Sequence, residues 1–365
     1  MAHVLNIDAL TLNPKEETTF ENVNKFLAAL TYMRPEIKQL HAIDTGVTMK
    51  QQIVIPSLLG KTGLKGSSTC DRQASGARAT LTEKYMEPVI IEDTFAMCPK
   101  AELDPLFKAH FDKIQKFRDI YEFEGASDEQ IFLGLLLSES INAAIWRAAW
   151  LGDTAVAAAG ATTAGLLSAA DIKFYNYFDG FLKQIIAGVG AGSIKRYEIT
   201  ENAQETKEAQ MTLDSGRAIA IFEEVKTKAD IRLKQNPAAQ FYVTDEIFEN
   251  AKKYLRDKSM AFELTTTMEG LPMLKWDGNP VINCESMFGL ANKTDFAQTS
   301  AGTAYRLPHI VILSTPENLR LHTLNENDFA DIESWYNRDE RKQKLAYGLT
   351  LDATVVQEHL VSVAY

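Results

Sequence analysis

Two glycine-rich segments of the sequence have residue types that could hold a phosphate group. The first is Gly60-Lys61-Thr62, which matches the end of the phosphate-binding loop of nucleotide hydrolases. That loop needs a glycine five residues before Gly60, where this chain has Ile55, and a helix after it, where this chain continues with glycines and serines. We therefore interpret this segment as a basic loop and not as a nucleotide site.

The second segment, residues 188–193 (GVGAGS), approaches the fingerprint of dinucleotide-binding turns. In that fingerprint a third glycine lets the helix pack closely on the strand, and this chain has Ser193 there. The segment also follows a predicted helix, where the fingerprint requires a strand. This pattern indicates the flexible end of a helix.

Metal-binding and nucleophilic patterns are not found in the sequence. No histidine pair has the spacing of a zinc-binding motif, no serine lies in a nucleophile elbow, and no cysteines form a CxxC pair. We therefore expect no catalytic residue, no cofactor, no metal site and no disulfide framework, in a reducing compartment where each cysteine packs as a small hydrophobe. The residues considered are His3, His41, His110, His309, His322 and His359, with Cys70, Cys98 and Cys284.

Length and charge limit the class of protein. The 365 residues have room for about two domains. A net charge of −11 argues against a protein that coats nucleic acid, although an acidic wall could enclose nucleic acid without adhering to it. The weakly polar stretch 151–170 is broken by glycines and an aspartate, and the N-terminus lacks a signal-peptide pattern. We expect a soluble protein made in the cytoplasm.

The most unusual predicted element is a protruding β-hairpin. Residues 51–58 and 77–95 have the composition of strands, and between them lies a polar loop rich in glycine and serine. A loop this long is usually functional, and an uncovered hairpin is only marginally stable in water. We therefore predict that the hairpin contacts another copy of the chain through the cations near its tip. These cations are Lys61, Lys65, Arg72 and Arg78.

The remaining patterns predict a mixed α+β chain with one very long helix. That helix begins at the capping box 127–130 and continues to Trp150, about 36 Å at ~1.5 Å per residue. Near the C-terminus, residues 349–355 alternate apolar and polar in the manner of a half-buried strand. The other predicted elements are helices at 104–121, 171–189, 217–235 and 244–257, strands at 240–243 and 309–313, and a turn at 277–280 between extended pieces.

This order of elements resembles the major capsid proteins of tailed phages, a family with the Johnson fold. The likeness spans nearly the whole chain and consists of element order and short sequence similarities. Two departures are the absence of a charged, coiled-coil-like N-terminal extension and the additional helix at 104–121. The matching stretches are 51–95 (the E-loop), 127–150 (the spine helix), 150–153 (the turn that ends the spine), 178–185, 241–248 (the strand-into-helix step of the axial domain), 275–282 (the "G-x-P-V" turn) and 344–365 (the closing strands).

The resemblance implies a division of the chain and a function. The implied parts are an N-terminal arm (1–45), the E-loop hairpin (46–98), a peripheral domain with the spine helix (99–165, completed near 260–285 and 325–355) and an axial domain (166–258 and 286–324) with a closing strand (356–365). The implied function is a non-enzymatic shell subunit, found in the virion, that forms hexamers and pentamers around double-stranded DNA. Portal and scaffold or decoration proteins are the implied partners, and no membrane is involved.

Two other functions remain open at this point. An encapsulin-type nanocompartment protein shares the fold, and a cargo enzyme encoded next to it would favour that alternative. An unrelated α+β enzyme would stay a small soluble species and turn over a substrate. Some relatives join a Lys to an Asn covalently, but nothing marks a matching Asn and Glu for Lys61 or Lys65, so we do not extend that chemistry to this chain.

Overall fold

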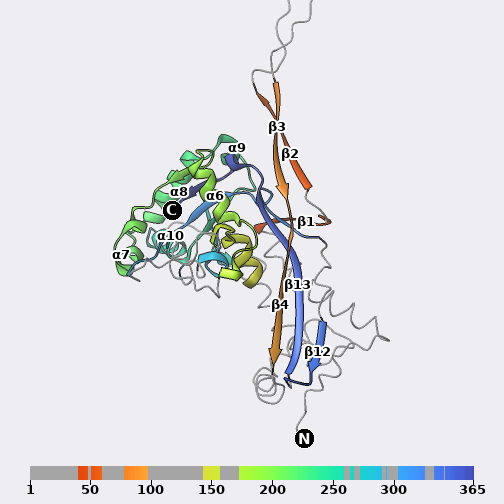
Figure 1. The fold of residues 1–365 in the computed structure, drawn as a ribbon. Helices are drawn as coiled ribbons and strands as arrows, with labels where there is room; N and C mark the ends of the chain where they lie inside the picture. The colour runs from red at the N-terminus through yellow and green to blue at the C-terminus, as the bar shows by residue number, and fades with distance from the viewer. Residues whose placement is uncertain are drawn as a thin grey trace, which may run out of the picture.

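In the computed structural model, a compact α+β body carries two long β-ribbons that extend from it in opposite directions (Figure 1). The predicted α+β class is confirmed. The predicted arm before residue 40, the loop 60–77, the helix 104–121 and the first part of the long helix lie outside the described residues. The described residues are 40–47, 51–59, 78–97, 143–156, 172–258, 264–266, 272–289, 293, 303–324, 333–340 and 342–365.

A seven-stranded sheet forms the centre of the body. Successive side chains along its strands point into two different apolar clusters. Tyr242 faces one cluster, and its neighbours Phe241 and Val243 face the other. Both faces are therefore buried at the central strands of the sheet. The strand order is β5 (Lys195–Tyr197), β14 (Ser362–Ala364), β10 (Val311–Ser314), β6 (Gln240–Val243), β9 (Asn279–Asn283), β8 (Pro272–Trp276) and β7 (Leu264–Thr266).

Helices cover both faces of this sheet. The amphipathic helices α8 (Arg217–Lys228) and α10 (Asp245–Asp257) pack on one face, through residues such as Phe222 and Phe248. On the other face lie α6 (Phe181–Gly190) and a helical segment at 143–151, the described end of the predicted long helix. Shorter pieces are η3 (Ile172–Phe174), η4 (Thr200–Ala203), α7 (Lys207–Met211), α9 (Ile231–Lys234), η5 (Glu285–Gly289) and η7 (Glu358–Leu360).

A second sheet is built on the fourteen-residue strand β13 (Lys342–Val355), which spans about 46 Å at ~3.3 Å per residue. Its C-terminal half pairs with β11 (Leu319–His322), which pairs in turn with β1 (Ala42–Asp44). Its N-terminal half extends beyond the body between β4 (Val89–Met97) and β12 (Glu333–Asn337). The apolar residues of the predicted alternation, Leu349, Leu351, Ala353 and Val355, all pack in the core. The strand is not half-buried, however, because the polar residues Asp352 and Thr354 between them are also buried.

The predicted hairpin is also confirmed. Strand β2 (Gln51–Leu59) pairs antiparallel with β3 (Arg78–Met86) along nine residues. The second predicted extended region is two strands, because the chain leaves β3 at Glu87-Pro88 and continues as β4, which pairs with β13 instead. Proline has no N–H to contribute to a ladder, which explains the change of partner there.

Two predicted helices are interrupted. The helix expected at 171–189 is broken before α6 because Gly180 approaches the backbone of Gly152, and its N–H donates to the Gly152 carbonyl at 2.9 Å. The helix expected at 217–235 ends at Lys228. There Asp230 accepts a hydrogen bond from the Arg232 N–H at 2.9 Å and starts α9.

The predicted turn at 277–280 is shorter, with Asp277 and Gly278 both at positive φ between β8 and β9, as in the tight turns of hairpins. The predicted domain boundaries stay a prediction. Strands β7, β8 and β9, from the region assigned to the peripheral domain, share the seven-stranded sheet with β6 and β10.

Candidate assembly surface

One of the predicted contact residues, Arg78, lies at the far end of the β2–β3 ribbon. Arg78 is the first residue of β3 and pairs with Leu59, the last residue of β2, so the loop between them continues from the end of the ribbon that is remote from Glu87. Lys61, Lys65 and Arg72 lie in that loop, outside the described residues. The backbone therefore places one of the four predicted cations, Arg78, at the end of the ribbon.

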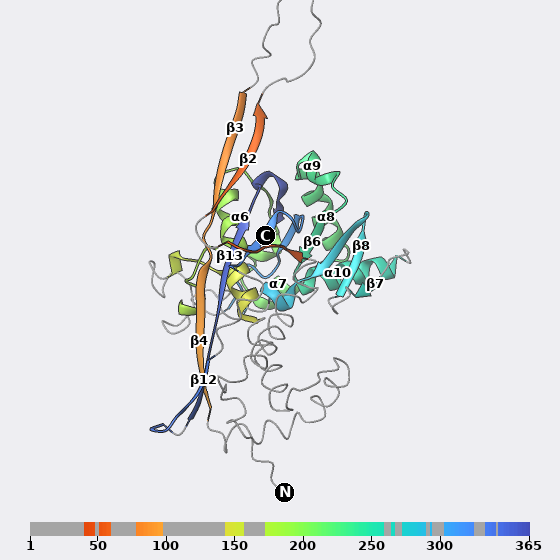
Figure 2. The same cartoon turned by 90° about the vertical axis from the view of Figure 1, so that its right-hand side faces the viewer.

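The β2–β3 ribbon projects away from the body, as Figure 1 and Figure 2 both show. Each strand has nine residues, about 30 Å at ~3.3 Å per residue. Among the described residues, neither strand pairs with a third. The outer edges of the ribbon thus present backbone N–H and C=O groups to which another chain can pair.

The β4–β13–β12 ribbon extends in the opposite direction along the same side of the body (Figure 2). On β4, the Ile90 side chain is 69% exposed although isoleucine normally packs in a core. Tyr85, at the end of β3 nearest the body, is 52% exposed. These apolar groups lie close to the junction of the two ribbons and are suited to contact with another molecule.

The base of the β2–β3 ribbon is joined to the body by hydrogen bonds. The Lys84 ammonium donates to the Val355 carbonyl at 2.7 Å and to Glu358 Oε1 at 3.0 Å. The other Glu358 oxygen accepts from the Ser193 hydroxyl, and this bond, together with Lys84, holds the pKa of Glu358 below its usual value. Three segments distant in sequence therefore meet where the ribbon begins.

A second attachment lies three residues further along the chain. The backbone N–H of Glu87 donates to Asp352 Oδ2 at 2.9 Å. Asp352 is 7% exposed, and burial raises its pKa even though two backbone N–H groups stabilise the carboxylate. Strand β13 thus anchors the ribbon at Asp352 and at its last residue, Val355.

Strand β1, which precedes the hairpin in sequence, is held by a buried histidine. The His41 ring stacks on Phe181 with centroids 4.9 Å apart, lies 5.5 Å from Trp150, and its Nδ1 contacts the Leu319 carbonyl at 3.0 Å. Complete burial lowers the pKa of His41 to about 3. The ring is therefore neutral at pH 7 and packs as part of the aromatic core.

A second histidine lies beside the end of β1. His322 is fully buried on β11, and its Nδ1 lies 3.3 Å from Asp44 Oδ2 without the alignment of a hydrogen bond. Arg320 donates to the same carboxylate oxygen at 3.1 Å. Burial lowers the pKa of His322 to about 4, against the opposing attraction of Asp44.

A buried ion cluster in the body is the clearest group of charges. Lys293 Nζ lies 2.6 Å from Glu246 Oε1 and 2.7 Å from Glu285 Oε1. Burial lowers the pKa of Lys293, but its hydrogen bonds to the two carboxylates outweigh that effect and raise it. The cluster joins α10 to η5, and we interpret it as structural.

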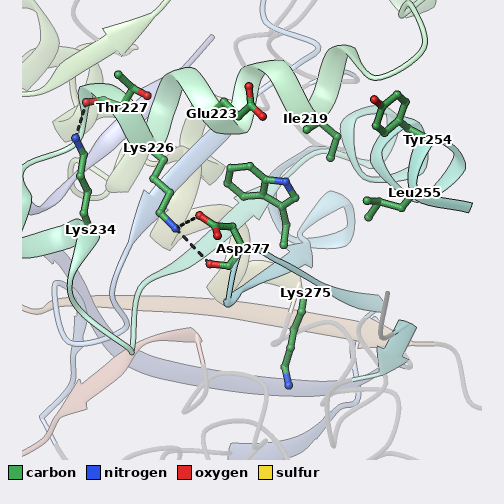
Figure 3. A pocket seen from close by; sticks show the side chains of 10 residues that line it. Ile219, Glu223, Lys226, Thr227, Lys234, Tyr254, Leu255, Lys275 and Asp277 are labelled. Carbon is green, nitrogen blue, oxygen red and sulfur yellow. Dashed lines mark hydrogen bonds and ion pairs between the residues drawn. The ribbon is translucent and has the colours of Figure 1, made fainter. Parts of the chain in front are cut away.

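The surface also has an open depression of about 780 Å³ on the α8 side of the sheet (Figure 3). Trp276 lines it, and the nearby cations bind to acceptors of the chain itself. Lys226 Nζ contacts Asp277 Oδ2 at 2.6 Å and Asn279 Oδ1 at 2.9 Å, and Lys234 Nζ contacts the Thr227 carbonyl at 2.7 Å. The lining shows no nucleophile with an adjacent base.

The second glycine-rich segment and one of the three cysteines lie in the described residues. The 188–193 segment is the end of α6 and its following turn, with Gly192 at φ +77°. Cys284 is a free, fully buried thiol whose pKa is raised by burial, so it packs as the predicted small hydrophobe. Cys70 and Cys98 lie outside the described residues. Within the described ranges, no group of His, Cys, Asp or Glu could hold a metal, and no helix is long and apolar enough to cross a membrane.

The sequence did not point to the residues that join the ribbon to the body. Lys84 and Glu358 are 274 residues apart, and Glu87 and Asp352 are 265 apart. No sequence motif marks any of these four residues. The one usable signal was Pro88, which marks the end of the β2–β3 pairing.

No protein-family model and no curated protein matches the chain. Among solved structures, it is similar to the satellite phage P4 procapsid including size determination (Sid) protein, at 12% identity and a TM-score of 0.46, over 91% of this chain and 96% of that one. It is similar to a chain of Gordonia phage Cozz at 12% identity and a TM-score of 0.49, over 90% and 85%. It is also similar to the holo-SrpI encapsulin complex from Synechococcus elongatus, at 9% identity and a TM-score of 0.40, over 91% and 86%.

Proposed function

We propose that this chain is the major capsid protein of a tailed phage or prophage, whose copies form an icosahedral shell around the DNA genome. The observation that carries the proposal is the pair of ribbons that project from the body in opposite directions, one of them a two-stranded ribbon without a third strand among the described residues (Figure 1). A two-stranded ribbon without cover is at best marginally stable in water. Identical copies arranged by symmetry supply that cover at every position of a closed shell.

The charge of the chain supports an enclosing role. Its net charge of −11 makes the subunit repel phosphate backbones overall, so packaged DNA would stay mobile against the wall. The described surface contributes exposed acidic pairs such as Glu223 and Glu224 on α8. DNA is thus enclosed without sequence-specific binding.

The contacts within the shell follow from the ribbons. The cationic end of the β2–β3 ribbon, with Lys61, Lys65, Arg72 and Arg78, contacts a neighbouring subunit within hexamers and pentamers. Portal and scaffold or decoration proteins complete the particle, and the subunits are made in the host cytoplasm. No catalytic step is assigned to the chain.

Expression of the chain followed by sedimentation and negative-stain microscopy tests the proposal. We expect hexamers, pentamers or closed shells. A 40.7 kDa species alone, at high concentration and with crowding agents, would overturn it. Shells can also be purified from the natural host. If they are closed, contain no nucleic acid and carry an enzyme encoded beside the chain, the chain is a nanocompartment protein and not a phage capsid protein.

A further inference from the structure

Among the described residues, two attachments of the β2–β3 ribbon to the body lie close together. One is the Glu87 N–H, bound to Asp352 at 2.9 Å, and the other is the Lys84 ammonium, bound to Val355 at 2.7 Å and Glu358 at 3.0 Å. The two points are three residues apart, about 10 Å along an extended chain. One attachment would act as a pivot, whereas two attachments define a direction.

The body side of the Lys84 contact is itself held in place. Glu358 is bound by the Ser193 hydroxyl, and Ser193 follows the end of α6, where its N–H donates to the Gly188 carbonyl at 3.0 Å. Val355 ends β13, and its N–H donates to Gln184 Oε1 of α6 at 2.9 Å. Both acceptors of Lys84 are therefore positioned by α6, which packs in the core.

We infer that Lys84 is a positioning residue that sets the direction in which the β2–β3 ribbon leaves the body, and through that direction the curvature of the shell. This inference rests on the proposed function for its second half only. The far end of the ribbon, at Arg78, lies about 30 Å from Glu87 along an extended chain. A rotation of about 10° around Glu87 would move that end by roughly 5 Å, more than a subunit contact tolerates without rearrangement.

Substitutions of Lys84 can distinguish an effect on the direction of the β2–β3 ribbon from an effect on the stability of the subunit. Lys84→Met keeps most of the side-chain length and removes the donors, whereas Lys84→Arg keeps the charge and donors to both acceptors. A matched control is Lys226→Met. Lys226 has the same 22% side-chain exposure and also contacts a carboxylate, but these contacts lie on the β8–β9 hairpin of the body.

The direction of the ribbon can be measured in the unassembled subunit. Nitroxide labels on Thr80→Cys of β3 and Glu224→Cys of α8, in a Cys70→Ser, Cys98→Ser background, report the distance between ribbon and body. Cys284 is buried and stays unlabelled. For Lys84→Met we expect a distance distribution broader by about 5 Å, as the rotation above implies. Lys84→Arg and Lys226→Met should keep the narrow distribution of the unmodified chain.

The same variants are then assembled and their particle diameters measured by microscopy. Lys84→Met should give a broad mixture of diameters and open sheets, and Lys84→Arg should restore a single diameter. An unchanged distance distribution in Lys84→Met, or a broadening equal to that of Lys226→Met, overturns the inference. If the unmodified chain forms no particles while Lys84→Met broadens the distance distribution, the proposed function fails and the positioning role of Lys84 stands.

Discussion

Gly152 and Gly180 touch backbone to backbone, and this contact fixes where the helical segment 143–151 ends against α6. The Gly180 N–H donates to the Gly152 carbonyl at 2.9 Å. A Cβ on Gly152 would lie 2.5 Å from the Phe178 carbonyl oxygen, and one on Gly180 would lie 2.7 Å from that of Ala149. Neither oxygen can move without distorting a helix or the segment before α6, so the contact requires glycine on both sides.

Gly152→Ala should therefore destabilise the subunit by about 1–3 kcal/mol, the usual cost of forcing an additional methyl group into a packed interior. Urea denaturation measures this as a lower midpoint at an unchanged slope. The control is Gly190→Ala at the end of α6, where an added Cβ meets nothing within 4 Å. That substitution should be neutral or stabilise by up to ~1 kcal/mol, because alanine favours helix. Equal effects of the two substitutions would show that the glycine contact is not tight.

Acid should lower the free energy of unfolding through the two buried histidines beside β1. The pKa is about 3 for His41 and about 4 for His322, whereas in the unfolded chain each returns to about 6.5. At pH values between the folded-state and unfolded-state pKa of each histidine, the unfolded state thus binds more protons than the folded state. The free energy of unfolding therefore falls as the pH decreases from about 6.5 toward 4. Each histidine contributes about 1 kcal/mol per pH unit in that window, near the limit of 1.36 for one proton.

Chemical denaturation at pH 7, 6, 5 and 4 measures this slope. His322→Gln should reduce the slope by about 1 kcal/mol per pH unit, because glutamine does not titrate. His359→Gln is the control, since His359 is only partly buried, in η7. A slope that His322→Gln leaves unchanged would mean that other groups cause the acid sensitivity.

Neutralising the tip of the β2–β3 ribbon should affect assembly more than folding. A chain with glutamine in place of Lys61, Lys65, Arg72 and Arg78 should change the free energy of unfolding by less than about 0.5 kcal/mol, as is usual for surface substitutions. Its assembly, followed by light scattering, should be slower than that of the unmodified chain, and the difference should shrink as salt screens the charges. Normal assembly of this variant at low salt would show that these four residues do not contribute to the contact between subunits.

Much of this fold could be predicted because its signals are local. The strand composition of β2 and of β3, the step from β6 into α10 and the alternation along residues 349–355 each depend on neighbours within about a dozen residues. The residues that pair between β2 and β3 lie 19 to 35 positions apart, but each strand has its own local signal. The break before α9 also had a local signal in Asp230, a good helix N-cap that a strictly periodic interpretation overlooked. In these stretches propensity and tertiary structure favour the same conformation.

The rest could not be predicted because its causes are remote in sequence. The break before α6 depends on the backbone of Gly152, 28 residues earlier, and periodicity carries no trace of that contact. Lys84 and Glu358 are ordinary surface-type residues until the fold brings them together. The candidate surface was thus predictable as a protruding hairpin, whereas the contacts that orient it required the structure.

The side-chain amide of Gln184 joins α6 to the end of β13 by hydrogen bonds. Because Gln and Glu have nearly the same shape, replacing Gln184 with Glu tests these hydrogen bonds with little change in packing. The Gln184 Nε2 donates to the Asp179 and Ala353 carbonyls, each at 2.6 Å, and its Oε1 accepts from the Val355 N–H at 2.9 Å. Gln184→Glu replaces the double donor with an acceptor, so two carbonyls face a carboxylate oxygen. We expect a loss of about 2–4 kcal/mol at pH 7, larger than for Gln184→Leu, which only removes partners from the three backbone groups.

The pH dependence of Gln184→Glu distinguishes hydrogen bonding from packing. Repulsion by the two carbonyls should raise the pKa of the new carboxyl group, and once protonated it regains one donor. The stability difference from the unmodified chain, measured by urea denaturation, should therefore shrink between pH 7 and pH 4.5. Gln204→Glu, at an exposed position after η4, should show little loss at either pH. A Gln184→Glu deficit that stays constant with pH would mean that side-chain packing, and not the donated hydrogen bonds, holds α6 to the strand from which Lys84 takes its acceptor.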